Sequence, residues 1–196
     1  MHAPSIIIAA VTALLAMPVF AQSQPAPQDM PVTGNVPLIC ALQTGQIQPG
    51  TSNNVIGLDG DTLRIAQFVN PDTLSVKAAS ATVRFDAVCN FAHAVRVESA
   101  NNGLWPTDAQ ITQAPAGFAF AVPYTASVSW GQANGQFNTD AKSRRLVQQI
   151  LNVDTPVAGQ LDLKIDIAEG ASNVETSAPV IAGNYADTVR IFLEPR

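Results

Sequence analysis

The sequence lacks the short motifs by which most enzyme families are recognised. It contains no G-x-S-x-G, no H-E-x-x-H, no P-loop and no Rossmann glycine pattern. Of its two histidines, only His93 lies outside the first 21 residues, so a catalytic triad or a histidine metal site would depend on this one side chain. The sequence therefore predicts a protein that is not an enzyme and that uses no metal and no cofactor.

The polar residues that could carry chemistry have simpler explanations. His93 alternates in step with Phe91, Val95 and Val97, which predicts a partly buried histidine in or beside a core, with both ring nitrogens hydrogen-bonded. Asp162 and Asp166 alternate with apolar residues on either side of Lys164. That pattern is typical of a solvent-facing strand rather than of a general acid and base held at different pKa values.

Positive charge is also scarce. The chain has 10 Lys and Arg against 15 Asp and Glu, a formal net charge of −5, which argues against nucleic-acid binding because such binding needs clustered cations. The one local basic cluster, Lys142, Arg144 and Arg145, is more typical of a solvated face.

Long apolar runs are absent except at the amino terminus. The run "IIIAAVTALLAMPVFA" closes on a small-residue pattern and predicts a signal peptide, residues 1–21, cleaved after Ala21. Residues 1–5 carry no Lys or Arg, and the alternative is an uncleaved membrane anchor. No later stretch is suited to span a bilayer, so the mature chain is expected to be exported, with no transmembrane segment left after cleavage.

Cysteine is limited to Cys40 and Cys89, both in the exported part. An even count in an oxidising compartment favours a disulfide between them, and the alternatives are a free reactive thiol or a two-ligand metal site.

Short alternating segments with many β-branched residues fill the chain after Cys40. We expect strands in "LRIAQFVN", "SATVRFDAVCNFAHAVRVES", "GFAFAVPYTASVSWG" and "GQLDLKIDIAEG", with turns at Pro71-Asp72, at residues 101–103 and at Asn134-Gly135. Residues 140–153 fit a short helix or an irregular strand. Many short strands with almost no helix predict an antiparallel β-sandwich over residues 40–196.

Residues 22–39 precede this domain as a Pro- and Gln-rich extension. Its second half alternates one apolar row, Met30, Val32, Gly34, Val36 and Leu38, with a row that includes Pro31 and Pro37. Residues 189–193 near the carboxyl end form a similar alternation, in which Val189, Ile191 and Leu193 share one face.

These features together resemble the spore coat protein U-like family, which includes pilins of the archaic chaperone-usher pathway. The resemblance covers about residues 30–195. It lies in the signal peptide, in "NVPLICAL" and "ATVRFDAVCNFAHAVRVES" around the two cysteines, in "VPYTASVSW", and above all in "AGNYADTVRIFLEP", which is similar to the family's closing G-x-Y-x-D-T-V-x-V strand.

The resemblance implies an immunoglobulin-like sandwich that lacks one strand. A periplasmic chaperone and then the extension of a neighbouring subunit would supply that strand, an outer-membrane usher would secrete the subunits, and a surface fimbria used in adhesion would result. Val189, Ile191 and Leu193 become the wall of the receiving groove, and Cys40 and Cys89 a bridge between the first two strands. Met30, Val32, Gly34, Val36 and Leu38 become the donated row, although this row also suits a plain first strand or linker.

A second hypothesis is a self-contained secreted sandwich that binds a ligand such as carbohydrate. Trp105, Tyr124, Trp130 and Tyr185 could line a sugar-binding face, but each also suits a sandwich core or edge. The first hypothesis predicts that the chain polymerises, whereas the second predicts a stable monomer with these aromatic side chains on one open face.

Overall fold

The computed structural model describes residues 27–108 and 113–196. The chain divides into a segment that ends at Val36 and a compact unit, Pro37–Arg196. In the first segment, residues 27–36 form neither helix nor strand, and the side chains of Met30, Val32 and Val36 are exposed. The predicted leader, residues 1–21, lies outside the described residues.

All regular structure in the described residues is β-strand, which confirms the all-β class. The strands are β1 (Cys40–Leu42), β2 (Gln46–Ile47), β3 (Val55–Asp59), β4 (Thr62–Ile65), β5 (Ala79–Cys89), β6 (His93–Ser99), β7 (Trp105–Pro106), β8 (Thr125–Trp130), β9 (Ala133–Asn138), β10 (Val147–Val153), β11 (Val157–Ile167), β12 (Tyr185–Ala186) and β13 (Val189–Pro195). Within the same residues, no helix is long and apolar enough to cross a lipid bilayer.

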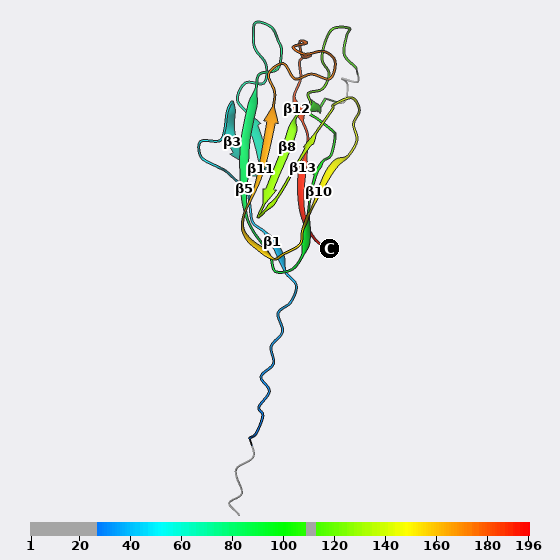
Figure 1. Ribbon diagram of the computed structural model, residues 1–196. Coiled ribbons are helices and arrows are strands. Elements are labelled where there is room, and N and C mark those ends of the chain that lie inside the picture. Colours follow the sequence, from blue (N-terminus) through cyan, green and yellow to red (C-terminus); the bar gives the residue numbers. More distant parts are fainter. Residues whose placement is uncertain (1–26, 109–112) are drawn as a thin grey trace, which may run out of the picture. The chain divides into compact units, whose positions relative to one another are not determined.

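The strands form two main antiparallel sheets (Figure 1). The larger sheet has the order β1-β5-β11-β8-β9, and β2 also pairs with β5. The smaller sheet has the order β10-β6-β13. Two further pairs, β3–β4 and β7–β12, lie outside these ladders.

The core lies between the two sheets and explains the alternation in the sequence. Successive residues of a strand point to opposite faces, so most of the buried side chains of β5, β6 and β11 stand at every second position. Leu161 and Leu163 of the larger sheet belong to the same apolar cluster as Val95 and Val97 of the smaller sheet. One shared core between two sheets is the arrangement of a β-sandwich, as the sequence predicts.

Two local predictions need correction. Residues 147–153 form the regular strand β10, paired with β6 in unbroken register, so the helix alternative was wrong. Asn134-Gly135 is not a turn but part of β9, because the chain reverses at Gly131, where φ is +59°. Gly135 has a packing role instead, since a Cβ there would approach Leu151 Cδ2 to 2.5 Å.

The two long sides of the sandwich differ. On one side β9 lies beside β10, where Leu151 packs onto Gly135 and joins the sheets. On the other side stands β13, which in the part of the chain described here forms a ladder with β6 alone. The core is therefore closed by packing on one side and bordered by a strand edge on the other.

Candidate functional site: an apolar groove beside the last strand

A groove of about 870 Å³ runs along the side of the sandwich where β13 stands. One wall is β13 with the residues just before it, and the opposite wall is the β3–β4 hairpin. The floor is the inner face of β5 and β11. Its apolar lining residues include Leu58, Leu63, Ile65, Phe68, Val83, Phe85, Leu163, Ile165, Tyr185, Val189 and Ile191.

The floor is a part of the core that remains incompletely covered. Val83 and Leu163 are buried there, but Phe85 and Ile165 are only half-buried although they point toward the second sheet. Apolar side chains left in this state stabilise the folded chain less than full burial would, because each exposed Å² forgoes roughly 25 cal/mol of burial free energy. An additional apolar layer over the groove would complete the core.

The structure brings two of the three predicted groove residues to this wall. Val189 and Ile191 line the groove, and all three of Val189, Ile191 and Leu193 pack against the main core cluster while only partly buried. Leu193 lies outside the groove lining, near the end of β13 where β1 comes close.

The main chain of β13 has one side turned to β6 and the other to the groove. Thr188 O accepts a hydrogen bond from Ala100 N at 2.9 Å, so the even-numbered residues that follow direct their N–H and C=O groups toward β6. Val189, Ile191 and Leu193 consequently direct theirs to the outer edge of β13, which is the groove side.

A polar cluster anchors the start of this wall. The Asp187 carboxylate accepts hydrogen bonds from Ser99 Oγ at 2.5 Å, Tyr124 OH at 2.7 Å and Asn101 N at 3.0 Å. Burial raises the pKa of Tyr124, which keeps its hydroxyl protonated as a donor. Asp187 thus fixes β13 to the neighbouring loop and to the chain before β8. In the sequence, Asp187 was noted only as part of the closing motif, and its hydrogen-bond partners were not predicted.

Charged side chains hold β13 to β6 on the outer face of the smaller sheet. Arg96 bonds Glu98 and Glu194 at 2.5 Å each, and its guanidinium lies 3.9 Å from the centroid of the Phe192 ring. Arg96 lowers the pKa of Glu194, so the pair is ionised at neutral pH. The wall is therefore rigidly held on its β6 side.

The cysteines are joined by a disulfide, as predicted. Cys40 and Cys89 are directly opposite each other where β1 pairs with the end of β5. The Asn90 side chain also connects the end of β5 to the residues before β1, because it donates to Pro37 O at 2.8 Å and accepts from Ile39 N at 2.8 Å. Disulfides of this kind are typical of compartments more oxidising than the cytosol.

The predicted donor row lies partly in each unit. Met30, Val32 and Val36 are exposed, and a Cβ added at Gly34 would have no heavy atom within 4 Å. Leu38 belongs to the compact unit and is also exposed, beside the residues that Asn90 holds. No described residue of this row forms part of a strand.

His93 and the aromatic residues lie in the core or in the groove, and His93 is more deeply buried than the sequence predicts. His93 is fully buried, with Nδ1 2.8 Å from Phe91 O and Nε2 accepting from Trp130 Nε1 at 2.6 Å. Trp105, Tyr124 and Trp130 are buried. Tyr185 is half-buried in the groove, where burial raises its pKa to about 12.

Two of the three residues of the basic cluster, Arg144 and Arg145, contact partners within the chain. Arg145 pairs with Asp140 at 2.8 Å, and Arg144 donates to Pro106 O while its guanidinium faces the Trp105 ring. In the ranges 27–108 and 113–196, no group of three or more His, Cys, Asp or Glu is placed to hold a metal ion.

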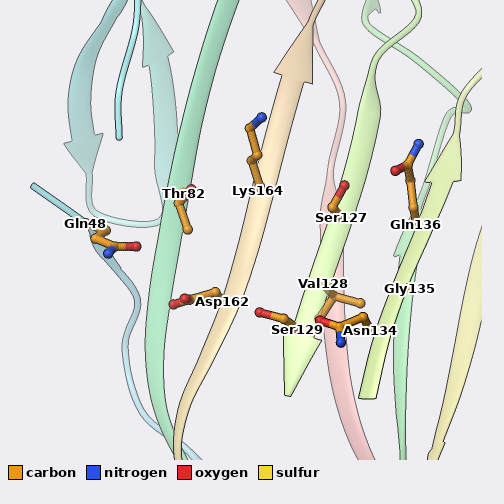
Figure 2. A pocket seen from close by; sticks show the side chains of 10 residues that line it. All are labelled: Gln48, Thr82, Ser127, Val128, Ser129, Asn134, Gly135, Gln136, Asp162 and Lys164. Carbon is orange, nitrogen blue, oxygen red and sulfur yellow. The ribbon is translucent and has the colours of Figure 1, made fainter. Parts of the chain in front are cut away.

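A second, shallower depression of about 500 Å³ lies on the outer face of the larger sheet (Figure 2). Most of its lining side chains are polar: Thr82 comes from β5, Asp162 and Lys164 from β11, Ser127 and Ser129 from β8, and Gln136 from β9. Arg84 binds Asp162 through two hydrogen bonds of 2.7 and 2.8 Å, and Lys164 pairs with Asp166. This is the charge alternation of a solvated sheet face.

No protein-family model matches the chain, and no curated protein matches its sequence. The fold and the groove therefore define the class: an antiparallel β-sandwich with an apolar groove beside the edge of its last strand.

Sequence reasoning missed most of the groove. The β3–β4 wall and the floor residue Phe85 were not predicted, because their contribution depends on contacts between distant segments. A weak signal was present in Leu58 and Leu63, which flank Gly60 in the turn of the β3–β4 hairpin.

Proposed function

We propose that the chain is a structural and adhesive subunit of a surface fimbria, assembled by exchange of β-strands between subunits. The observation that carries the proposal is the outer edge of β13, which borders an apolar groove over an incompletely covered core. A strand laid along this edge would gain main-chain hydrogen bonds, and its alternate side chains would cover Phe85 and Ile165. The resemblance of the sequence to spore coat protein U-like pilins supports the same proposal.

The partners follow from the same surface. An apolar groove beside an open strand edge favours aggregation, so a chaperone should occupy the groove in the periplasm before another subunit does. An outer-membrane usher would then pass the subunit to the cell surface, where the extension of a neighbour replaces the chaperone. Met30, Val32, Gly34, Val36 and Leu38 form the proposed donated row.

The alternative of a self-contained carbohydrate-binding module draws no support from the aromatic residues. It required several of them on one open face, whereas Trp105, Tyr124 and Trp130 are buried and Tyr185 is half-buried in the groove. The polar depression of Figure 2 is lined largely by hydroxyl, amide and charged side chains that suit contact with water.

The experiment compares polymerisation of the mature chain, residues 22–196, with that of two point variants. Gly34→Phe places a large side chain in the donated row, and Asn35→Phe places the same side chain in the opposite row. Gly34 has open space around it, so its substitution should not disturb the folded unit. We expect Gly34→Phe to slow polymer growth, measured by light scattering, and Asn35→Phe to leave it near the wild-type rate.

Deletion of residues 22–36 gives the complementary result. The shortened chain should stay folded when a chaperone occupies its groove, yet it should stop fibres from growing because it has nothing to donate. Polymerisation of the deletion variant, or wild-type assembly of Gly34→Phe, would contradict the proposed function.

A further inference from the structure

Met30 is the one methionine that follows the predicted leader, residues 1–21. Its side chain is 86% exposed. The other two sulfur atoms of the mature chain belong to Cys40 and Cys89, which are joined in the disulfide, so neither is a free thiol. An oxidant in solution therefore meets one reduced sulfur, the thioether of Met30, and oxidation converts a methionine to its sulfoxide.

The other side chains that oxidants attack are protected by the fold. The indole rings of Trp105 and Trp130 and the imidazole of His93 are buried. Met30 belongs to the segment that ends at Val36, outside the compact unit. A mild oxidant should therefore modify Met30 and leave the folded unit unchanged.

Met30 also begins the proposed donated row, whose other members are Val32, Gly34, Val36 and Leu38. Glycine adds no side chain to this row, and valine is short. Met30 and Leu38 are therefore the two members that reach furthest from the main chain. A change at Met30 alters one of the two side chains that would reach deepest into the groove.

The groove suits the reduced form of methionine. Phe68, Phe85 and Tyr185 contribute three aromatic rings to its lining, and the ring centroids of Phe68 and Tyr185 lie 5.2 Å apart. A thioether packs favourably against aromatic rings, and its unbranched chain adapts to irregular space.

The same groove has little to offer a sulfoxide. The sulfoxide oxygen is a hydrogen-bond acceptor, and a buried acceptor needs a donor. The Tyr185 hydroxyl already donates to Ile181 O at 2.9 Å. The outward N–H groups of Val189, Ile191 and Leu193 would bond the main chain of the inserted strand. A sulfoxide buried here would lose its water without gaining a partner, which costs free energy.

We propose that oxidation of Met30 controls strand exchange: the thioether permits insertion of the extension, and the sulfoxide impedes it. The inference rests on the proposed function, which puts the row that contains Met30 into the groove of a second copy of this chain.

The oxidant we assign is a peroxide. The Met30 sulfur attacks one peroxide oxygen, an S–O bond forms as the O–O bond breaks, and the sulfur gives up two electrons that the peroxide gains. With hydrogen peroxide, the departing hydroxide takes up the proton that the first oxygen releases, and it leaves as water.

The order of events decides what oxidation would do. Met30 is exposed while the extension is free, and insertion would cover it. Peroxide would therefore stop the addition of new subunits and spare the fibres already formed. Methionine sulfoxide can be reduced enzymatically, so the block would be reversible.

The experiment treats the mature chain, residues 22–196, and its Met30→Leu variant with dilute hydrogen peroxide, which is then removed. Leucine has a similar volume to methionine and no sulfur. Mass spectrometry of proteolytic peptides locates the added oxygen. Light scattering follows polymer growth, and each treated chain is compared with its own untreated sample.

We expect oxidised wild type to grow roughly tenfold more slowly than untreated wild type, because a polar oxygen would have to be buried unpaired. Treated and untreated Met30→Leu should grow at equal rates. Methionine sulfoxide reductases should restore the growth of the oxidised wild type.

Complete oxidation of Met30 with no change in wild-type growth would overturn the inference and leave strand exchange intact. Equal slowing of both treated chains would also overturn it, because the damage would then lie elsewhere. In finished fibres, peroxide should oxidise Met30 more slowly than in free chains, and equal rates would show that insertion does not cover this side chain. Absence of polymer growth in both untreated chains would contradict the proposed function itself.

Discussion

At the scale of single residues, His93 illustrates how one polar group can be accommodated in an apolar core. The indole of Trp130 can only donate, so Nε2 of His93 is the acceptor and the ring proton resides on Nδ1, which donates to Phe91 O. Both nitrogens are satisfied by neighbours, and the side chain links β6 to β8 across the core. His93 therefore has a structural role in the core.

Asp140 gives a prediction on acid stability at the same scale. Its pKa is lowered from 3.8 to about 2, first by the hydrogen bond from Lys142 N, then by Asn102 and Arg145. A group whose pKa is lower in the folded state adds stability above the unfolded pKa and loses it as the pH falls through the folded value. Asp140→Asn should therefore lower the free energy of unfolding at pH 6, and the difference from wild type should disappear by about pH 2.

Urea unfolding at a series of pH values would measure this difference. Asp72→Asn, at an exposed position, serves as a control for general loss of negative charge. A gap between wild type and Asp140→Asn that stays constant down to pH 2 would contradict the assignment.

At the scale of elements, β13 is fixed by Asp187 and by the Arg96 cluster on its β6 side, while its other side faces the groove. Ile191 packs on the core cluster and lines the groove, whereas Val97, directly opposite it on β6, is 1% exposed. Substitution to Ala at these paired positions should separate binding from folding.

Ile191→Ala should lower the free energy of unfolding by about 1–2 kcal/mol, less than for a fully buried Ile, because this side chain is only partly buried. It should also weaken binding of a fluorescent peptide of residues 28–39 by about tenfold, since the proposed donated row packs on this side chain. Val97→Ala should lower the free energy of unfolding by more than Ile191→Ala does, and it should leave the affinity for the peptide nearly unchanged. Equal losses of stability and affinity in both variants would mark Ile191 as an ordinary core position.

The elements also show which parts of the fold could be predicted from sequence. Alternation predicted β11 and β13 well, because apolar residues recur at every second position on the inner face of each strand. It failed at Asn134-Gly135, where the glycine is needed for contact with Leu151 on the other sheet. It did not decide between helix and strand for residues 140–153, because Leu146 and Ile150 are exposed apolar residues that obscure the period of two.

Only part of the groove could be predicted, because local alternation identifies residues that share a face of one strand. Val189 and Ile191 lie on one strand, so their shared face follows from the local sequence. The opposite wall and the floor come from segments far away in the chain, and Asp187 meets Tyr124 through folding alone. Contacts between segments far apart in the chain produce no periodic pattern in the sequence.

At the scale of the whole molecule, the sandwich is joined at one end by the bond between Cys40 and Cys89. Alkylation of the unfolded, unreduced protein should label neither cysteine. Replacing both by Ser should lower the free energy of unfolding by about 4 kcal/mol, from the loop entropy of the intervening chain. Labelling of both cysteines in freshly isolated protein would contradict the bridge.

The same bond determines how the compact unit would bear a mechanical load. A pull on the segment before Cys40 enters the unit through β1, a strand of 3 residues. Hydrogen bonds alone would let so short a strand peel away from its neighbour. The covalent link passes the traction directly to β5, whose 11 residues are all paired with β11. Under tension, the compact unit would therefore be held by its two longest strands, and the short pairing of β1 with β5 would carry almost none of the force.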